Sequence, residues 1–417
     1  MPMVLQTNDG QSIRPRRALW IVAVGFGLIF CGCRPGAEPP LPTFASVPEP
    51  YQPMPDSGNA LDGYLFAGRQ MMAHPDVQER KFTPQHESRI AKDASEAIAQ
   101  VRRAGQSPMR WVMPSRGPEA EPVRAGWRLL GRAIAFRIKL RLADGDMRGA
   151  IDDLLTGTRF GMDLTLGPAM ETDLGAIIAD ECRAAFTPAI ARLDRSERRR
   201  VIAGLRETLT RSANRTEAFA REGENQRLWI AWLRDRQLKR DWEPVKAMFY
   251  PDGDNVARYL DARKPDPRKV NPFFTGLADE QLQLEAFWKR HGGADERVPE
   301  LPKFEPKRVW RAPALHFLST FVPMHQRYGI AAARLRILAL TLGMQDRPDR
   351  GRGLTSTAPF SDDLARDPFS GRDLMITQTP SGARIYSVGV NGVDDGGETD
   401  EAGLSPDLSL ESIPQAR

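Results

Sequence analysis

Apolar residues recur at helical spacing over most of the chain, and the pattern is most regular between residues 174 and 193. The apolar positions there are Leu174, Ile177, Ile178, Cys182, Ala185, Phe186, Ala189 and Leu193. Steps of three and four residues place side chains on one face of an α-helix, so the segment predicts an amphipathic helix that buries this face. Pro188 lies inside the stripe, and we expect it to bend or end the helix.

Capping residues divide the surrounding region into further helices. Thr83-Pro84 predicts the start of a helix that runs to about Ala104, because proline is favoured at the first helical position. Asp194 followed by Glu197 has the spacing of a capping box and predicts another helix start. The segment 228–233, Leu-Trp-Ile-Ala-Trp-Leu, predicts an aromatic-rich helix that adds bulk to the core.

Proline-rich segments interrupt the helical pattern in its second half. Residues 244–275 contain five prolines and predict a long loop. A helix is expected from Leu277 to His291, followed by a second proline-bearing loop around 299–306. The last long helix is expected from about Ala314 to Leu342, with an interruption near Pro323.

The helical pattern between Leu129 and Leu166 is broken by Asp144-Gly145-Asp146, which predicts two helices joined by a turn. The turn glycine and the acidic residue after it resemble a tetratricopeptide-type helical hairpin. No second copy occurs at the period of about 34 residues that such repeats have. A single unit of this type cannot be stable without neighbours, so we predict an irregular helical bundle or α-solenoid for residues 59–345.

The composition changes to Gly, Asp, Ser and Pro after Pro348. The segment 367–371, Asp-Pro-Phe-Ser-Gly, is typical of a turn. Leu374–Thr377 and Ala383–Val388 predict two strands, and the Thr-Pro-Ser-Gly segment between them predicts a hairpin. The predicted fold class is therefore mainly α, with a small C-terminal β-hairpin module.

This module resembles the C-terminal end of the major pseudopilin of type II secretion systems. The shared features are an Asp-Pro turn, a short strand, a Tyr386-Ser387-x-Gly389 strand and an acidic Gly/Asp loop, all preceded by a long helix. The chain also resembles exported bacterial proteins that combine this ending with a helical N-terminal region. The processed Gly/Phe start of the pseudopilin helix is absent, because Gly25-Phe26 lies inside an apolar N-terminal segment. The resemblance implies the fold of the hairpin.

The pseudopilin resemblance also implies a calcium ion in the acidic loop. The matching candidates are Asp394, Asp395 and Asp400, with backbone carbonyls around Asn391. Calcium prefers six to eight oxygen ligands, which clustered carboxylates and loop carbonyls can supply. The alternative is a solvated acidic segment, since further acids follow between Glu398 and Glu411. No other cofactor is expected.

The N-terminal segment has the order of an export signal. Three arginines at positions 14, 16 and 17 precede an uncharged apolar run from Ala18 to Phe30. Residues 28–33, Leu-Ile-Phe-Cys-Gly-Cys, resemble the lipobox of bacterial lipoprotein signals, which implies that Cys33 is acylated and becomes the new N-terminus. An uncleaved signal anchor and an ordinary cleaved signal are the alternatives. All three interpretations export the rest of the chain.

Residues 34–58 contain eight prolines and predict an extended tether between the membrane and the first domain. The predicted organisation is 1–33 export signal and lipobox, 34–58 proline-rich tether, 59–345 helical domain, 346–397 β-hairpin module, and 398–417 acidic disordered tail. We expect localisation in the cell envelope, with the folded part facing the periplasm or the outside. The expected partners are the membrane and an envelope protein.

Composition and motifs exclude several functions. The net charge of +5 is small for 417 residues, and the arginines are interleaved with acids, so nothing indicates nucleic-acid binding. Phosphate loops, hydrolase elbows and zinc-protease motifs are absent from the sequence. Cys182 lies on the apolar stripe and is interpreted as a buried core residue. Four residues could still meet in a pocket of an enzyme: His74, His86, Glu171 and Glu181.

The function that we favour from sequence is a non-enzymatic, membrane-tethered helical scaffold that binds an envelope component. One alternative is an envelope hydrolase whose catalytic residues converge from distant segments. A second alternative is a secretion-system-related assembly component, which rests on the C-terminal module alone.

Overall fold

The computed structural model describes residues 52–54, 57–78, 84–111, 120–214, 216–248, 253–262, 274, 281–283, 286, 321–346, 362–379, 382–397 and 407–410. The predicted export signal, most of the predicted tether and most of the helix expected over 277–291 lie outside the described residues. Within the described part, no helix combines the length and the apolar composition that crossing a membrane requires.

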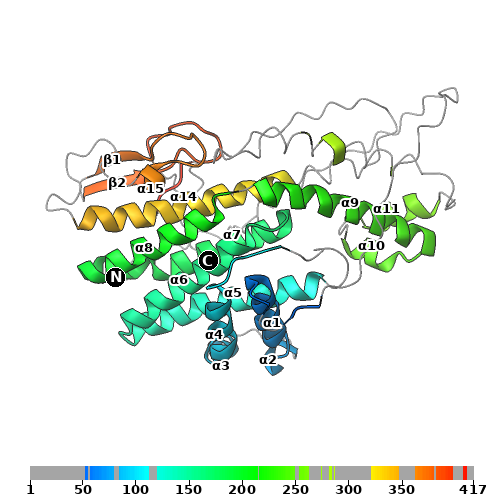
Figure 1. The fold of residues 1–417 in the computed structure, drawn as a ribbon, viewed down its shortest axis with the longest axis horizontal. Coiled ribbons are helices and arrows are strands. Elements are labelled where there is room, and N and C mark those ends of the chain that lie inside the picture. The colour runs from blue at the N-terminus through cyan, green and yellow to red at the C-terminus, as the bar shows by residue number, and fades with distance from the viewer. Residues whose placement is uncertain are drawn as a thin grey trace, which may run out of the picture. The chain divides into compact units, whose positions relative to one another are not determined.

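Helices dominate the described part (Figure 1). In chain order the first are α1 (Ala60–Met72), α2 (Pro75–Gln78), α3 (Pro84–Asp93), α4 (Ser95–Ala104), α5 (Ala120–Ala143), α6 (Met147–Leu164) and α7 (Ala169–Phe186). They are followed by the 3₁₀ helix η1 (Thr187–Arg192), α8 (Arg195–Ser212), α9 (Thr216–Lys239), α10 (Glu243–Met248), α11 (Gly253–Asp261), α14 (Phe321–Gln345) and α15 (Asp362–Ala365). Two strands complete the set, β1 (Met375–Thr379) and β2 (Gly382–Tyr386). The predicted mainly α fold with a C-terminal hairpin is confirmed.

The centre of the helical domain is the group α5, α6 and α7, in which each helix contacts the other two. Helix α1 packs on α5 and α4, whereas α14 packs on α7 and α8. Fully buried Trp127, Phe160 and Phe186 fill the space between these elements. The apolar stripe predicted over 174–193 is part of this core, because all of its eight members except the half-buried Ile177 are buried.

Glycines allow α6 and α7 to approach backbone to backbone. A Cβ added at Gly161 would lie 2.5 Å from the carbonyl oxygen of Gly175, and one added at Gly175 would lie 2.2 Å from the carbonyl oxygen of Gly161. Real Cβ atoms do not approach backbone oxygens this closely, so the crossing requires glycine on both helices.

Several local predictions are confirmed. Helix α7 ends at Phe186, and Pro188 lies in the 3₁₀ turn that follows. Asp194 and Glu197 form both halves of the capping box at the start of α8. The predicted turn at Asp144-Gly145-Asp146 separates α5 from α6, and Asp146 also caps α6 by accepting a hydrogen bond from the Gly149 amide at 2.9 Å. These features depend on residues close together in the chain.

Two local predictions are wrong. The segment 244–275 contains α10 and α11 instead of one long loop, because Pro244 lies in the first turn of a helix, where its missing N–H costs nothing. Pro323 lies in the first turn of α14, and the part of the expected helix before Phe321, which would show whether the helix is interrupted, lies outside the described residues. The helix expected to run from residue 83 to 104 is divided into α3 and α4, with Ser95 donating to the carbonyl of Lys92 at 2.8 Å.

The C-terminal module consists of the antiparallel hairpin β1–β2 and the Asp-Pro turn before it. Asp367 is fully buried, and its carboxylate accepts hydrogen bonds from the amides of Phe369 and Val388 and from the Ser387 hydroxyl, at 2.9, 3.1 and 2.9 Å. One carboxylate therefore ties the turn to the end of β2.

The module packs on α14. Ala333 of α14 forms an apolar cluster with Phe369, Val388 and Leu408 of the module. Leu408 also pairs with Ser387 through two backbone hydrogen bonds of 2.9 Å. The prediction of disorder over 398–417 is therefore wrong for residues 407–410. Leu408 buries its side chain in the apolar cluster, and its backbone pairs with Ser387 just after β2.

Candidate functional site: a polar pocket lined by arginines

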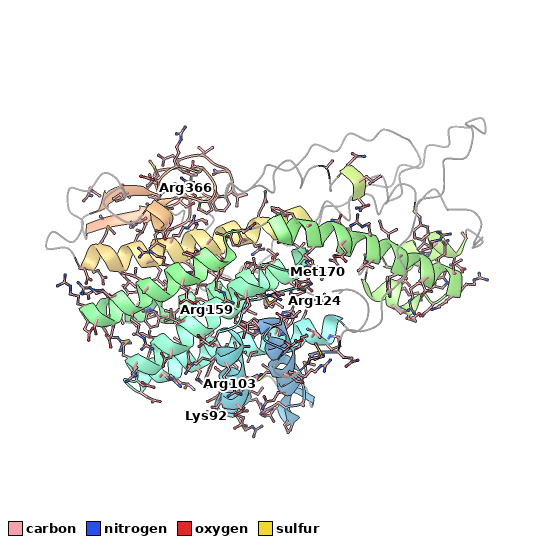
Figure 2. All side chains as sticks on the ribbon, viewed as in Figure 1. Lys92, Arg103, Arg124, Arg159, Met170 and Arg366 are labelled. Carbon is pink, nitrogen blue, oxygen red and sulfur yellow. The ribbon has the colours of Figure 1, made fainter. Side chains whose placement is uncertain are left out.

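A cavity of about 240 Å³ lies where α4, α6 and α8 meet, with Tyr64 of α1 at its inner end. Its lining comprises Tyr64, Val101, Arg102, Gly105, Gln106, Asp152, Leu155, Thr156, Arg159, Gly204, Glu207 and Thr208. Most of these side chains are polar or charged, and Figure 2 shows Arg159 amid the helices that form the pocket. The volume and the polar groups of the lining suit a small molecule that carries polar or charged groups.

The inner end of the pocket is built on a buried hydrogen bond between Tyr64 and Asp163. The Tyr64 hydroxyl donates to the Asp163 carboxylate at 2.6 Å, and both side chains are buried. Arg211 of α8 donates to the same carboxylate at 3.3 Å and to the carbonyls of Gly105 and Ser107. This group joins α1, α6 and α8 to the end of α4.

Burial raises the pKa of Asp163 to about 6, although Arg211, the hydrogen bond from Tyr64 and Arg159 all favour the charged form. Burial and the neighbouring Asp163 also raise the pKa of Tyr64 well above its ordinary value. A carboxyl group that titrates near neutral pH beside a cavity is a feature of many functional sites.

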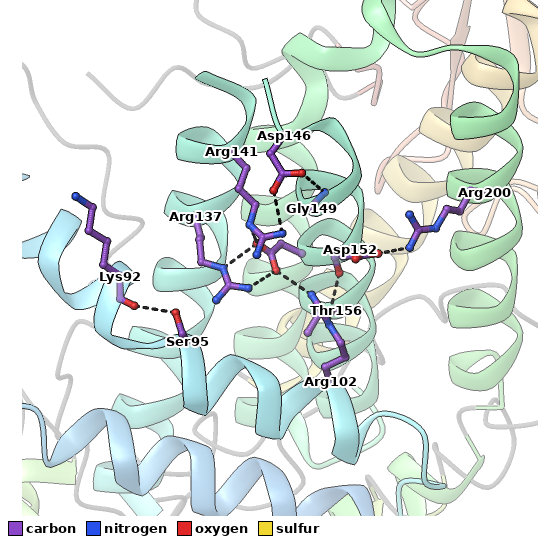
Figure 3. A network of polar contacts seen from close by, with 11 residues as sticks. Lys92, Ser95, Arg102, Arg137, Arg141, Asp146, Gly149, Asp152, Thr156 and Arg200 are labelled. Carbon is purple, nitrogen blue, oxygen red and sulfur yellow. Dashed lines mark hydrogen bonds and ion pairs between the residues drawn. The ribbon is translucent and has the colours of Figure 1, made fainter. Parts of the chain in front are cut away.

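One wall of the pocket belongs to a second buried network, centred on Asp153 (Figure 3). The Asp153 carboxylate is fully buried and forms ion pairs with Arg102, Arg137 and Arg141, at 3.1, 2.8 and 3.0 Å. Arg141 also pairs with Asp146 at 3.5 Å. Three guanidinium groups therefore share two carboxylates, which leaves one positive charge uncompensated within this group.

Ion pairs also occupy the outer part of the pocket. Arg159 pairs with Glu207, and Asp152 pairs with Arg200. Both pocket carboxylates are therefore already engaged by a guanidinium group, and neither is free to act as an isolated base. The arrangement is suited to binding a charged group more than to acid–base chemistry.

The four residues expected to mark an enzyme do not line this pocket. Glu171 is fully buried and pairs with Arg124 at 3.1 Å. Glu181 lies ten residues further along α7, which places it about 15 Å away along the helix axis. Burial raises the pKa of Glu181, whereas Arg132 opposes the shift.

The two histidines belong to α3 and to the segment before α2. His74 Nε2 lies 3.2 Å from the Asp93 carboxylate, and His74 Nδ1 accepts a hydrogen bond from the Asp76 amide at 3.2 Å. Both ring nitrogens are therefore engaged, so His74 is not positioned as a general base. The hydrogen bond from Arg89 holds the pKa of Asp76 below its ordinary value, and His86 acts in the same direction.

Cys182 is fully buried, as the apolar stripe predicts. Burial, with Glu181 adding to it, raises the pKa of the thiol well above its ordinary value. A reactive cysteine needs a stabilised thiolate, which this environment disfavours.

Of the proposed calcium ligands, Asp394 and Asp395 are described, whereas Asp400 and the lipid-attachment candidate Cys33 lie outside the described residues. Asp394 accepts hydrogen bonds from the Tyr386 hydroxyl and the Gly396 amide, at 2.9 and 3.0 Å. Asp395 accepts one from Asn391 at 3.1 Å. In the ranges that the structure describes, no three His, Cys, Asp or Glu side chains gather as a metal site would need.

The pocket residues were missed by sequence reasoning because their partners are far apart in the chain. Tyr64 and Asp163 are separated by 99 positions, and Arg102 and Asp153 by 51. One signal was present: Asp153 and Asp163 interrupt the side of α6 that carries buried Leu154, Phe160 and Leu164. An acid on an apolar face requires a partner, since an unpaired buried charge is costly.

No protein-family model, no curated protein and no solved structure matches this chain significantly.

Proposed function

We propose that this chain is an exported envelope protein, held at a membrane by its N-terminal segment, in which a helical domain and its C-terminal module form a non-enzymatic binding scaffold. Attachment through an acylated Cys33 and an extended tether over 34–58 would keep the folded part near the membrane. The expected partner is another protein of the envelope.

The observation that carries this proposal is the pairing of buried acids with arginines. Asp153, Asp163 and Glu171 are buried, and each contacts at least one guanidinium group. Such pairs fix the relative positions of the helices that they join, and removing one partner is strongly destabilising. An envelope hydrolase would need an acid and a base exposed together, whereas Asp152 and Glu207 in the pocket are each held by an arginine.

The C-terminal module supplies a surface for a partner. Large apolar side chains that are exposed in the described part are Met54, Leu238, Leu282, Met375, Val390 and Val393. Met375, Val390 and Val393 belong to the module. Three of these six side chains therefore belong to one small unit, and we take them as the candidate interaction surface.

The test is photo-crosslinking in cells that express the full chain with a photoreactive amino acid at Val393. We expect discrete crosslinked products of higher mass. The same amino acid at Leu238, which is exposed on α9 away from the module, is the matched control. Absence of products at Val393, or the same products at both positions, would contradict the proposal.

The second candidate function is a secretion-system-related assembly component. It is favoured by the packing of the hairpin and the Asp367 turn on α14, since the resembling pseudopilins also place a long helix before this hairpin. Crosslinks from Val393 to components of a secretion machinery would support it, and crosslinks to other envelope proteins alone would exclude it. The calcium site proposed at Asp394, Asp395 and Asp400 belongs to this candidate function, because both rest on the resemblance to pseudopilins.

A further inference from the structure

Arg102 presents unused hydrogen-bond donors at the pocket. Its Nε donates to the Thr156 hydroxyl at 3.2 Å and its Nη2 donates to Asp153 at 3.1 Å. Among the residues that the structure describes, no side chain or carbonyl accepts from its Nη1. Arginine can donate five hydrogen bonds in a planar fork, so this guanidinium keeps the donors that a carboxylate or phosphate would need.

The uncompensated charge of the Asp153 network is most accessible at Arg102. The side chain of Arg102 is 43% exposed, compared with 13% for Arg137 and 28% for Arg141. Of these three arginines, only Arg102 lines the pocket. The surplus positive charge therefore faces the cavity and not the protein interior.

Arg159 is the second cation of the pocket. Its Nη1 donates to the Gly105 carbonyl at 3.3 Å, and its other terminal nitrogen pairs with Glu207. The Glu207 side chain is 62% exposed, whereas that of Arg159 is 13% exposed. An exposed carboxylate on a flexible side chain gains little from such a pair, so a bound anion could replace it at small cost.

We propose that this pocket binds a small oxyanion, a carboxylate or a phosphate, which Arg102 and Arg159 hold between them. A cavity of about 240 Å³ admits several water molecules at ~30 Å³ each, so it also admits an anion with a few carbon atoms. Thr156 and Thr208 line the same cavity and direct their hydroxyl hydrogens to carbonyls of their own helices, which leaves the guanidiniums as the main donors.

The test is thermal unfolding of the full chain in detergent, with inorganic phosphate or succinate titrated against chloride at constant ionic strength. A ligand that binds only the folded state raises the unfolding temperature in a saturable way. We expect saturation with at least one of the two anions, and the anion that saturates at the lower concentration identifies the chemical class. No saturable shift with either anion would overturn the proposal.

Three variants test the assignment of residues. Arg102→Gln should weaken binding by roughly tenfold or more, since a charged hydrogen bond is lost. Arg103→Gln is the matched control, because Arg103 is adjacent on α4 but lies outside the pocket, where it contacts Glu96 and Gln100 (Figure 2). Equal affinity in these two variants would overturn the assignment.

The third variant is Glu207→Gln, which changes an exposed residue and so preserves folding even if Arg102→Gln does not. It releases Arg159 and removes a negative charge, so binding should become tighter than in the unmodified chain. Weaker or unchanged binding would contradict the role given to Arg159. Absence of crosslinks at Val393 would contradict the binding scaffold and would not affect the anion site. The two proposals are therefore tested independently.

Discussion

At the scale of single residues, the buried acids of this protein differ in how completely they are compensated. Asp153 pairs with three guanidiniums, whereas Asp163 receives one hydrogen bond from Tyr64 and one ion pair at 3.3 Å. The difference has a consequence for Asp163, because its burial outweighs its partners and raises its pKa to about 6.

The raised pKa of Asp163 predicts a loss of stability as the pH rises. The folded state binds this proton more tightly than the unfolded state, in which the pKa is ordinary, so protonation stabilises the fold. The contribution is fully present below about pH 4 and is lost as the pH rises through about 6. The pKa of Asp163 in the folded state lies about two units above its ordinary value, so the free energy of unfolding should fall by ~3 kcal/mol between low pH and pH 7.

Asp163→Asn tests this linkage, because it retains an acceptor for Tyr64 and cannot ionise. We expect the unmodified chain to lose stability relative to this variant between pH 4 and pH 7, as measured by denaturant unfolding at each pH. Asp144→Asn, at an exposed position in the turn between α5 and α6, is the control and should follow the unmodified chain. Parallel curves for Asp163→Asn and the unmodified chain would refute the linkage.

Single residues also show what the sequence could predict of the site. The burial of Cys182 was predictable, because apolar residues such as Ile178 and Phe186 recur on both sides of it at helical spacing. The convergence of Tyr64, Asp163 and Arg211 was not, because the three residues lie on helices whose contacts depend on the whole domain. Local spacing carries no information about such pairs.

At the scale of helices, α6 and α7 approach each other backbone to backbone where they cross. Gly161 and Gly175 face each other there, and a side chain at either position would meet the backbone of the other helix. Backbone atoms cannot move aside as the end of a side chain can, so the helices would have to separate.

Gly161→Ala should therefore destabilise the fold by ~3 kcal/mol, despite the higher helix propensity of alanine. Gly204→Ala on α8 is the matched comparison, because the added methyl group would meet the side chain of Leu155, which can move. We expect this second variant to change the free energy of unfolding by no more than about 1 kcal/mol. Equal losses in urea unfolding would contradict the proposed backbone contact.

Helix ends show why some elements were predicted and others were not. Asp194 and Glu197 form a capping box from hydrogen bonds within four residues, so the sequence alone predicts the start of α8. The start of α7 has no side-chain cap of its own, and Glu222 of α9 accepts from the Ala169 amide at 2.7 Å instead. The proline at the start of α10 was misinterpreted, because proline ends a helix at one position and is favoured in the first turn at another.

At the scale of the whole molecule, the described part joins a helical domain to a C-terminal module through α14. One side of α14 packs on α7 and α8, and Ala333 and Ile330 contact the module. The fold class was predictable because helical and strand periodicities occupy separate parts of the sequence. The pairing of residues 407–410 with the hairpin could not be predicted. Leu408 is a single buried apolar residue in an acidic segment, and one residue makes no recognisable pattern.

The central claim for the whole molecule is that the chain is exported and attached to a membrane at Cys33. The direct measurement is metabolic palmitate labelling of the unmodified chain and Cys33→Ala, combined with membrane fractionation and the mass of the N-terminal peptide. We predict a labelled, membrane-bound chain that begins at Cys33, and no label in the variant. An unlabelled chain in the cytosolic fraction that retains residues 1–32 would contradict the account.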